Sequence, residues 1–156
     1  VLRHAGGEVT VIGKHGWKLD LARSWGLKVS SVGDGEFRAG SFPVVVEATG
    51  SPAGLKEALR LAAPRGTVVM KSTFREPAHF ETAKLVVDEI TLLGSRCGNF
   101  AVALEMLARG HVKVQHLVSK TFSLEDGLRA FAYLDQTSCL KVLLAPRAGR
   151  PESTGP

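Results

Sequence analysis

Short runs of apolar residues rich in Val and Ile alternate along the chain with longer segments in which apolar residues recur every three or four positions. Runs of the first kind predict buried strands, and segments of the second kind predict helices with one buried face. Their alternation is typical of an α/β protein with a parallel sheet and helices on both faces. The predicted strands are residues 8–13, 28–32, 43–49, 66–71 and 89–95.

Helical spacing is clearest in three stretches between and after these strands. They are residues 18–25, 54–63 and 100–110. Around the first, Trp17, Leu21 and Trp25 stand four residues apart, which predicts one buried stripe. The third ends at Gly110, and glycine is the usual left-handed stop of a helix.

Beyond residue 110 the pattern changes. Ser123 and Asp126 have the spacing of a capping box, which predicts a helix from residue 124, and residues 139–146 predict a last strand. The tail, residues 147–156, carries Gly, Pro, Ser and charge with almost nothing apolar to bury. We therefore expect it to be disordered.

Composition and charge exclude several classes of protein. At 156 residues and 44% hydrophobic content, the chain is long enough for one ordinary core. The net charge of +5 comes from scattered basic residues, which argues against a nucleic-acid partner. No apolar run approaches the roughly 18 residues of a membrane span, and Cys97 and Cys139 are too few for a disulfide framework. We expect a soluble, cytoplasmic protein with no membrane partner.

The join between the first predicted strand and the first helix carries Gly13, Lys14 and His15. In a doubly wound sheet, ligands bind across the carboxyl ends of the strands, and the residue that closes the second strand lies beside the adenosine ribose of a dinucleotide. An acidic residue there would favour NAD. Glycine followed by a cationic residue removes the repulsion of a 2′-phosphate and favours NADP. These three residues alone fit a plain strand-to-helix turn equally well.

Four stretches follow one another along the chain: VTVIGKHGWKLDLARSWGLKV, VVVEATGSPAGLKEALRLAAPRGTVVM, VVDEITLLGSRCGNFAVALEMLARG and FSLEDGLRAFAYLDQTSCLKVLL. In this order and spacing they resemble the medium-chain dehydrogenase/reductases, the zinc alcohol dehydrogenase superfamily. The resemblance covers residues 1–146 and corresponds to the cofactor-binding half of the family fold. It implies a Rossmann-like, doubly wound parallel sheet in residues 1–114, followed by residues 115–146, which return to the catalytic domain.

The resemblance also implies which residues contact a dinucleotide. The adenosine ribose would lie at the join of strand and helix, and the remaining ribose and the nicotinamide would lie beside the residues that follow the next strands. A basic residue in the last strand reaches the pyrophosphate in many members. The residues at these positions are Gly13, Lys14, His15, Lys18, Ala48, Thr49, Ser51, Lys71, Ser72, Thr73, Ser95, Arg96, Cys97 and Lys141.

The chemistry that the resemblance implies is hydride transfer between an alcohol and a carbonyl compound, with NADP preferred and NAD possible. The partners would be the dinucleotide, a small alcohol or carbonyl substrate, and a second copy of the chain paired through the edge of the strand at 89–95. Glu47 could act as an acid or base, but a structural role fits it better. Cys97 fits the wall of the nicotinamide pocket better than a reactive thiol.

Two departures from the family pattern limit these expectations. The chain has no GxGxxG turn, and VLRHAGGEV at its start resembles the second half of the helix that follows this turn. The strand before the turn, the middle strand of such a sheet, is then missing too. The N-terminal catalytic domain, which holds zinc in the zinc-dependent members, is also missing, so any zinc would belong to that domain.

We therefore expect a C-terminal fragment of an NAD(P)-dependent, alcohol dehydrogenase-like oxidoreductase, inactive by itself, whose sheet lacks its first strand and its glycine-rich turn. The alternative is a noncatalytic nucleotide-binding or interaction module.

Overall fold

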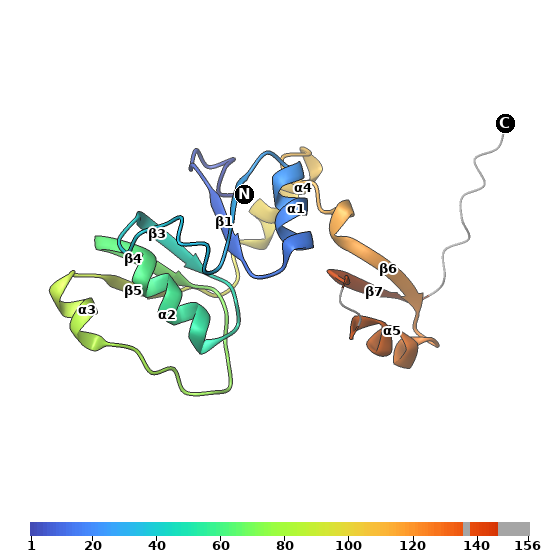
Figure 1. Cartoon of the computed structure of the whole chain (residues 1–156). Coiled ribbons are helices and arrows are strands. Elements are labelled where there is room, and N and C mark those ends of the chain that lie inside the picture. Colours follow the sequence, from blue (N-terminus) through green and yellow to red (C-terminus); the bar gives the residue numbers. More distant parts are fainter. Residues whose placement is uncertain (136–137, 147–156) are drawn as a thin grey trace. The chain divides into compact units, whose positions relative to one another are not determined.

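The computed structural model describes residues 1–135 and 138–146 (Figure 1). Contacts divide the chain into a main unit, Thr10–Asn99, and a second unit, which combines Val1–Val9 with Phe100–Pro156. The predicted boundary after residue 114 stays a prediction. The disorder predicted for residues 147–156 falls outside the described part of the chain.

The main unit alternates strands and helices. Its elements are β1 (Thr10–Gly13), α1 (Gly16–Ser24), β2 (Lys28–Ser31), β3 (Phe42–Glu47), α2 (Pro52–Leu61), β4 (Ala62–Met70), α3 (Thr82–Val87) and β5 (Thr91–Gly94). All the strands predicted in this part of the sequence are present, and α1 and α2 are the predicted helices. The spacing does not predict α3, because this short helix has no buried residue and exposes Val86 and Val87.

The strand pairs of the main unit are parallel, as the sequence pattern predicts. β1 pairs with β2, and β4 lies between β3 and β5. In a doubly wound sheet, one further strand would lie between β1 and β3 and join these two sheets. The described residues supply no strand at that place, so β1 and β3 each pair with one neighbour. The α/β fold class is confirmed, with the sheet in two pieces.

Helix α2 covers one face of the β3–β4–β5 sheet and supplies the core of the main unit (Figure 1). Its buried side chains Leu55, Ala58 and Leu59 pack against Val68 of β4 and against Ile90, which precedes β5. Each fully buried aliphatic side chain of this kind stabilises the fold by roughly 1.5 to 3 kcal/mol relative to exposure. This packing fixes the sheet whose strand ends form the candidate site.

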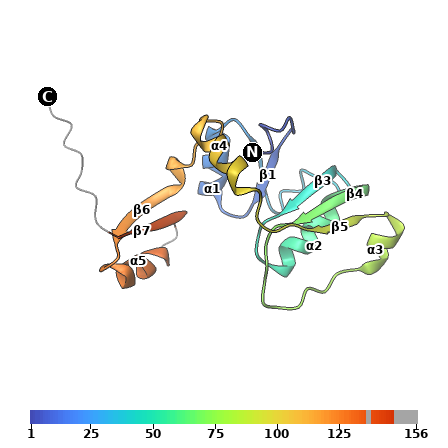
Figure 2. The same ribbon diagram turned by 180° about the vertical axis from the view of Figure 1, so that it is seen from behind.

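The face of the β3–β4–β5 sheet opposite α2 exposes apolar side chains. Figure 2 shows the same ribbon from behind. Because successive side chains of a strand point to opposite faces, Val45 packs against the core while Val44 and Val46 project away from it. Val44 is 58% exposed, and Leu93 on β5 is 50% exposed. The pattern of a sheet buried on both faces is therefore present in the sequence, but the described main unit covers only one face.

Helix α1 buries a different side from the one that its sequence predicts. Its buried residues are Leu19 and Ala22, whereas Trp25 is exposed and Trp17 and Leu21 are only partly buried. The predicted stripe is therefore wrong. The helix packs on the two-stranded β1–β2 sheet, and the small Ala22 allows a closer approach to this narrow surface than a tryptophan would.

The second unit has elements of its own. They are α4 (Phe100–Ala108), the 3-10 turn η1 (Gln115–Leu117), β6 (Val118–Ser123), α5 (Gly127–Leu134) and β7 (Lys141–Ala145). β6 and β7 pair in parallel, and α5 packs on them through its buried Ala130 and through Tyr133, whose ring lies edge-on to Phe122. β7 is the predicted last strand. β6 is missed because four of its six residues are polar. No helix in the described residues is both long and apolar enough to cross a bilayer.

Helix α5 begins at Gly127, three residues later than the sequence predicts. Ser123 and Asp126 do interact as a capping pair, since the amide N–H of Asp126 donates to the Ser123 hydroxyl at 3.3 Å. Ser123 is still part of β6, however, so the bond closes a turn of residues 124–126 before the helix starts. The prediction of a helix from residue 124 is wrong for this reason.

The first seven residues have the hydrogen bonds of a helix end. The amide N–H of Gly7 donates to the carbonyl of Leu2, and that of Gly6 donates to the carbonyl of Arg3, each at 3.1 Å. Gly6 has a φ of 88°, so the pattern is that of a helix closed by a left-handed glycine. The structure has turns but no helix in residues 2–6, so the interpretation of VLRHAGG as the end of a helix stays a prediction.

Candidate functional site

Strands β3, β4 and β5 end side by side, and the segments that leave them begin at one edge of the sheet, here called the strand-end edge. In the register of the sheet, Glu47 lies beside Met70, and Met70 lies beside Gly94. The pairing continues one residue further, because the amide N–H of Lys71 donates to the Glu47 carbonyl at 2.8 Å and that of Ser95 donates to the Met70 carbonyl at 2.9 Å. The three segments that follow these strands thus begin at the same edge of the sheet. They are residues 48–51, 71–73 and 95–97.

The last residue of β3 is a buried acid. Glu47 is 2% exposed, and its Oε1 accepts two hydrogen bonds from Thr49, from the amide N–H and from the hydroxyl, each at 2.6 Å. Its Oε2 accepts a hydrogen bond from the hydroxyl of Ser72. A buried carboxylate held by several donors is stable only because these donors replace water.

Thr49 and Ser72 in turn hold the turn that follows β3. The Ser72 hydroxyl accepts the amide N–H of Gly50 at 3.0 Å, and the Thr49 hydroxyl lies 3.2 Å from that of Ser51. Ser51 is the N-cap of α2 and accepts the amide N–H of Gly54 at 3.2 Å. One network therefore runs from the end of β4, through Glu47, to the start of α2.

The environment of Glu47 decides whether it acts as an acid or base or has a structural role. Burial by itself raises the pKa of the Glu47 carboxyl, but the hydrogen bonds from Ser72, Thr49 and Gly50 outweigh burial and lower the pKa below its ordinary value. A carboxyl that is ionised and already fully engaged is a poor acid at neutral pH. The geometry favours the structural interpretation of Glu47 over acid–base catalysis.

Lys71 links the end of β4 to the end of β5. Its ammonium group donates to the Ser95 hydroxyl at 3.4 Å and also to the backbone carbonyl of Arg96. Arg96 and Cys97 are both exposed beside this link. The structure thus brings together the members of the predicted site that follow β3, β4 and β5. They are Ala48, Thr49, Ser51, Lys71, Ser72, Thr73, Ser95, Arg96 and Cys97.

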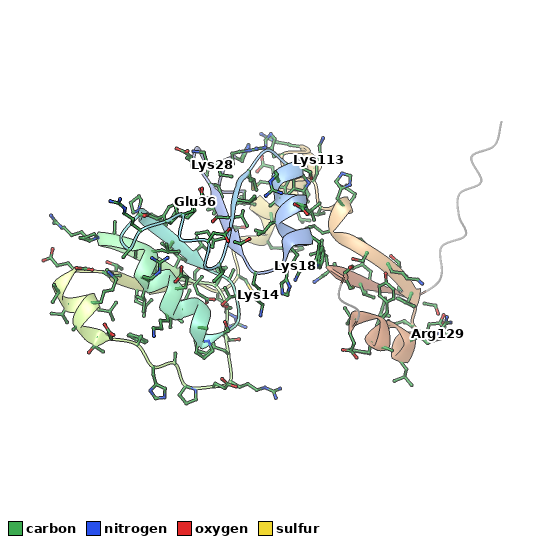
Figure 3. The ribbon with its side chains drawn as sticks, viewed as in Figure 1. Lys14, Lys18, Lys28, Glu36, Lys113 and Arg129 are labelled. Carbon is green, nitrogen blue, oxygen red and sulfur yellow. The ribbon has the colours of Figure 1, made fainter. Side chains whose placement is uncertain are left out.

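A second group of predicted site residues lies where β1 ends and α1 begins. Figure 3 shows Lys14 and Lys18 at this junction, and both are exposed. His15 is the N-cap of α1, but its side chain makes no capping hydrogen bond, and the first turn contains no acid. The unpaired N–H groups of a helix start carry partial positive charge. Together with the two ammonium groups, they make this junction favourable to an anion.

The glycine at position 13 is explained by the lack of room for a side chain at this junction. A Cβ on Gly13 would lie 3.3 Å from the Cδ2 atom of Leu19, which is tighter than an ordinary contact. The absence of a side chain therefore lets the buried Leu19 of α1 lie against the end of β1.

Lys141 is the first residue of β7 in the second unit, where it pairs with Val118. Its predicted contact with a pyrophosphate is therefore not tested by the geometry of the main unit.

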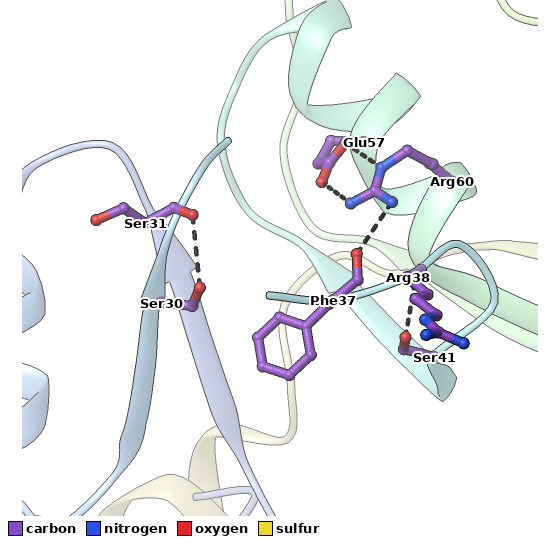
Figure 4. Close-up of polar contacts among 7 residues, drawn as sticks. All are labelled: Ser30, Ser31, Phe37, Arg38, Ser41, Glu57 and Arg60. Carbon is purple, nitrogen blue, oxygen red and sulfur yellow. Dashed lines mark hydrogen bonds and ion pairs between the residues drawn. The ribbon is translucent and has the colours of Figure 1, made fainter. Parts of the chain in front are cut away.

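Sequence reasoning missed a cavity of about 290 Å³ in the main unit. Its lining includes Ile12 of β1, Ser30 of β2, Phe37 and two residues of α2, Glu57 and Arg60. Figure 4 shows the bonds that hold the β2–β3 connection beside this cavity, with the Arg60 guanidinium donating to Glu57 at 2.8 and 2.6 Å and to the Phe37 carbonyl at 3.2 Å. The hydrogen bond from Arg60 lowers the pKa of Glu57 against the opposing effect of burial.

The only sequence signal for this arrangement is a Glu and an Arg three residues apart on a predicted helix. That spacing is common on exposed helix faces, and nothing in it indicates the third partner, the carbonyl of Phe37.

The structure also bears on metal binding. No group of three or more His, Cys, Asp or Glu side chains that could hold a metal ion occurs within residues 1–135 and 138–146.

The chain was compared with known proteins. The sequence model described as zinc-binding dehydrogenase matches residues 1–109. The starvation-sensing protein RspB of Escherichia coli K12 is 29% identical over 106 residues, which are 65% of this chain and 31% of RspB. The sorbitol dehydrogenase of Macaca fascicularis is 29% identical over 103 residues, which are 65% of this chain and 29% of that enzyme.

Solved structures extend the likeness over most of the chain. A zinc-binding dehydrogenase from Sinorhizobium meliloti 1021, solved with NADP bound, has a TM-score of 0.80 and 27% identity, covering 93% of this chain and 47% of that one. RspB from E. coli CFT073, solved in complex with NADH, has a TM-score of 0.80 and 24% identity, and the match again covers 93% of this chain and 47% of that one. This chain thus spans about a third of the curated relatives and about half of these structures.

Proposed function

Because the chain belongs to the zinc-binding dehydrogenase family, we propose that its main unit binds a nicotinamide dinucleotide along the strand ends and that the protein contributes to hydride transfer between an alcohol and a carbonyl compound. The observation that carries the proposal is the convergence of residues 48–51, 71–73 and 95–97 at the strand-end edge. In an open α/β sheet, this edge is where ligands bind. Two solved structures that resemble the chain contain NADH and NADP.

The residues of the strand-end edge would orient the cofactor. Their hydroxyl groups and backbone N–H and C=O groups suit a ribose and a carboxamide, which both donate and accept hydrogen bonds. The hydride comes from the dinucleotide when it is bound, and the protein supplies binding and orientation. Ala48, Thr49 and Ser51 would lie nearest the nicotinamide ribose, and the segments after β4 and β5 would hold the carboxamide.

NADP is the cofactor that the β1–α1 junction favours. Lys14 and Lys18 supply positive charge, Gly13 supplies no carboxylate, and the start of α1 adds backbone N–H groups. A 2′-phosphate would gain from all three features, whereas the 2′-hydroxyl of NAD would gain little from the charges. The donor set therefore fits the phosphate better than the hydroxyl.

Further parts of the proposal concern assembly and location. β5 is the outer strand of its sheet and has exposed side chains, so pairing with a second copy through this edge is the proposed dimer contact. Zinc, if the protein uses it, would be held outside the residues described here. A cytoplasmic location stays a prediction.

Titration of the folded chain with NADPH and NADH tests the cofactor proposal, with energy transfer from the tryptophans Trp17 and Trp25 as the signal. Circular dichroism is recorded beforehand to establish that the chain is folded. Saturable binding, tighter for NADPH, is the expected result. Equal binding of the two cofactors would contradict the NADP preference alone. A folded chain that binds neither would contradict dinucleotide binding and leave the interaction module as the better account.

A further inference from the structure

Glu47 is nearly inaccessible yet bonded to two of the segments that would surround a dinucleotide. With 2% of its surface exposed, it offers no surface that a ligand could touch. Its carboxylate is nevertheless joined to Thr49, in the segment after β3, and to Ser72, in the segment after β4. The two partners bind different oxygens of the carboxylate, Thr49 on Oε1 and Ser72 on Oε2.

These bonds determine where backbone groups of the strand-end edge point. The amide N–H of Thr49 is held directly by Glu47, and the amide N–H of Gly50 is held by the Ser72 hydroxyl at 3.0 Å. Without the carboxylate, Ser72 would lose the acceptor that orients its hydroxyl. Two consecutive amides and the hydroxyl of Thr49 would then be free to turn.

We infer that Glu47 is a positioning residue for dinucleotide binding: it holds residues 48–51 and Ser72 in one arrangement and thereby sets the affinity for a cofactor that it does not touch. The inference rests on the proposed function. It adds a residue outside the predicted contact set and explains why a buried acid closes β3. An apolar residue would fill the same space but leave Thr49 and Ser72 without their common acceptor.

The test compares Glu47→Gln with Glu57→Gln in the whole 156-residue chain. Both replace a hydrogen-bonded carboxylate of the main unit, but Glu57 binds Arg60 beside the cavity and no residue of the strand-end edge. The dissociation constant for NADPH is measured at a temperature at which both variants are folded. Exchange of the Thr49 and Gly50 amide hydrogens is followed by NMR in the absence of cofactor.

For Glu47→Gln we expect a dissociation constant about tenfold higher and faster exchange of both amides. For Glu57→Gln we expect both quantities to stay near the wild-type values. If the wild-type chain binds NADPH and Glu47→Gln binds it with the same dissociation constant, the inference is overturned and the proposed function stays intact. A folded wild-type chain that binds no NADPH overturns the proposed function, and the inference with it.

If Glu47→Gln does not fold, Ser72→Ala and Ser72→Thr decide the question. Ser72→Ala removes one donor to Glu47 and the acceptor of the Gly50 amide, whereas Ser72→Thr keeps the hydroxyl. Faster exchange and weaker binding in the alanine variant, with both restored in the threonine variant, support the inference. Equal behaviour of the two variants overturns it.

Discussion

The hydroxyl of Ser72 donates a hydrogen bond to the carboxylate of Glu47, although the two residues are 25 positions apart in the sequence. Glu47 closes β3, and Ser72 is the second residue after β4. The bond therefore ties the exits of two neighbouring parallel strands at the edge where a ligand would bind. It also makes the main unit sensitive to the protonation of one buried acid.

Acid should weaken the main unit through Glu47. Burial raises the pKa of this carboxyl, but the hydrogen bonds from Ser72 and Thr49 lower it further than burial raises it, so the folded-state pKa lies below the ordinary value of 4.5. Such a group stabilises the fold above its unfolded-state pKa, and this contribution is lost as the pH falls through the folded-state pKa. We expect the free energy of unfolding, measured in urea, to decrease below about pH 5.

Glu47→Gln should be less stable than the wild type at pH 7 and should lose less stability on acidification, because glutamine does not titrate. Glu76→Gln serves as the control, since Glu76 is exposed in the β4–α3 connection, and its unfolding curves should follow those of the wild type. Identical slopes against pH for Glu47→Gln and the wild type would show that Glu47 does not carry this dependence.

Gly54→Ala should destabilise the start of α2. A Cβ on Gly54 would lie 2.6 Å from the Cβ and 2.7 Å from the Cγ2 atom of Thr49, and nearer still to its hydroxyl oxygen. Overpacking of this kind typically reduces stability by about 1 to 3 kcal/mol. Thermal and urea unfolding measure the change, and weaker NADPH binding should accompany it because Thr49 is displaced.

Gly127→Ala is the matched control for that substitution. Gly127 is also helical, but nothing lies within 4 Å of its would-be Cβ. We expect it to be neutral or to stabilise by up to about 1 kcal/mol, because alanine favours the helix. If the two alanine variants had the same stability, the close contact at Thr49 would not be the cause.

Val44→Lys should reduce self-association of the chain. Val44 is 58% exposed on β3, an edge strand of the described sheet. Exposed apolar edge strands pair with other chains, and lysine on such a strand opposes this pairing. Light scattering over a range of protein concentrations should show a lower average mass for the variant. Val86→Lys, at a 76% exposed position on α3, should have no comparable effect.

Lys14→Ala should weaken the binding of NADPH about fivefold, because a charge-assisted hydrogen bond to the 2′-phosphate is lost. The dissociation constant for NADH should change less than twofold. Lys28→Ala is the control, because Lys28 is exposed at the amino end of β2, away from the strand ends. An equal loss of affinity for both cofactors would contradict a contact between Lys14 and the 2′-phosphate.

The strands were predictable because buried strands are runs of apolar residues in the sequence. Runs such as residues 43–49 and 66–71 are apolar because both faces of a parallel strand are normally covered. β6 has only two apolar residues among six, and α3 contributes only the partly buried Leu85 to the core, so neither carries the periodicity on which prediction depends. The stripe of Trp17, Leu21 and Trp25 failed because spacing does not indicate which side of α1 meets a two-stranded sheet.

The candidate site was predictable in its location more than in its bonds. Because parallel strands end at a common edge, the sequence indicates that residues after β3, β4 and β5 converge. The pairing of Glu47 with Ser72, and of Arg60 with the Phe37 carbonyl 23 positions away, depends on the register between segments far apart in the chain. No local pattern encodes that register, so only the folded structure shows these bonds.

The central claim is that a dinucleotide binds across the strand ends of the main unit. Its most direct test is an NMR titration of the isotope-labelled chain with NADPH. The account predicts saturable shifts of the amide signals of residues 13–15, 49–51, 72–73 and 95–97, with those of β6 and α5 little changed. Saturable shifts that leave these four segments unaffected, or a folded chain that shows none, would contradict it.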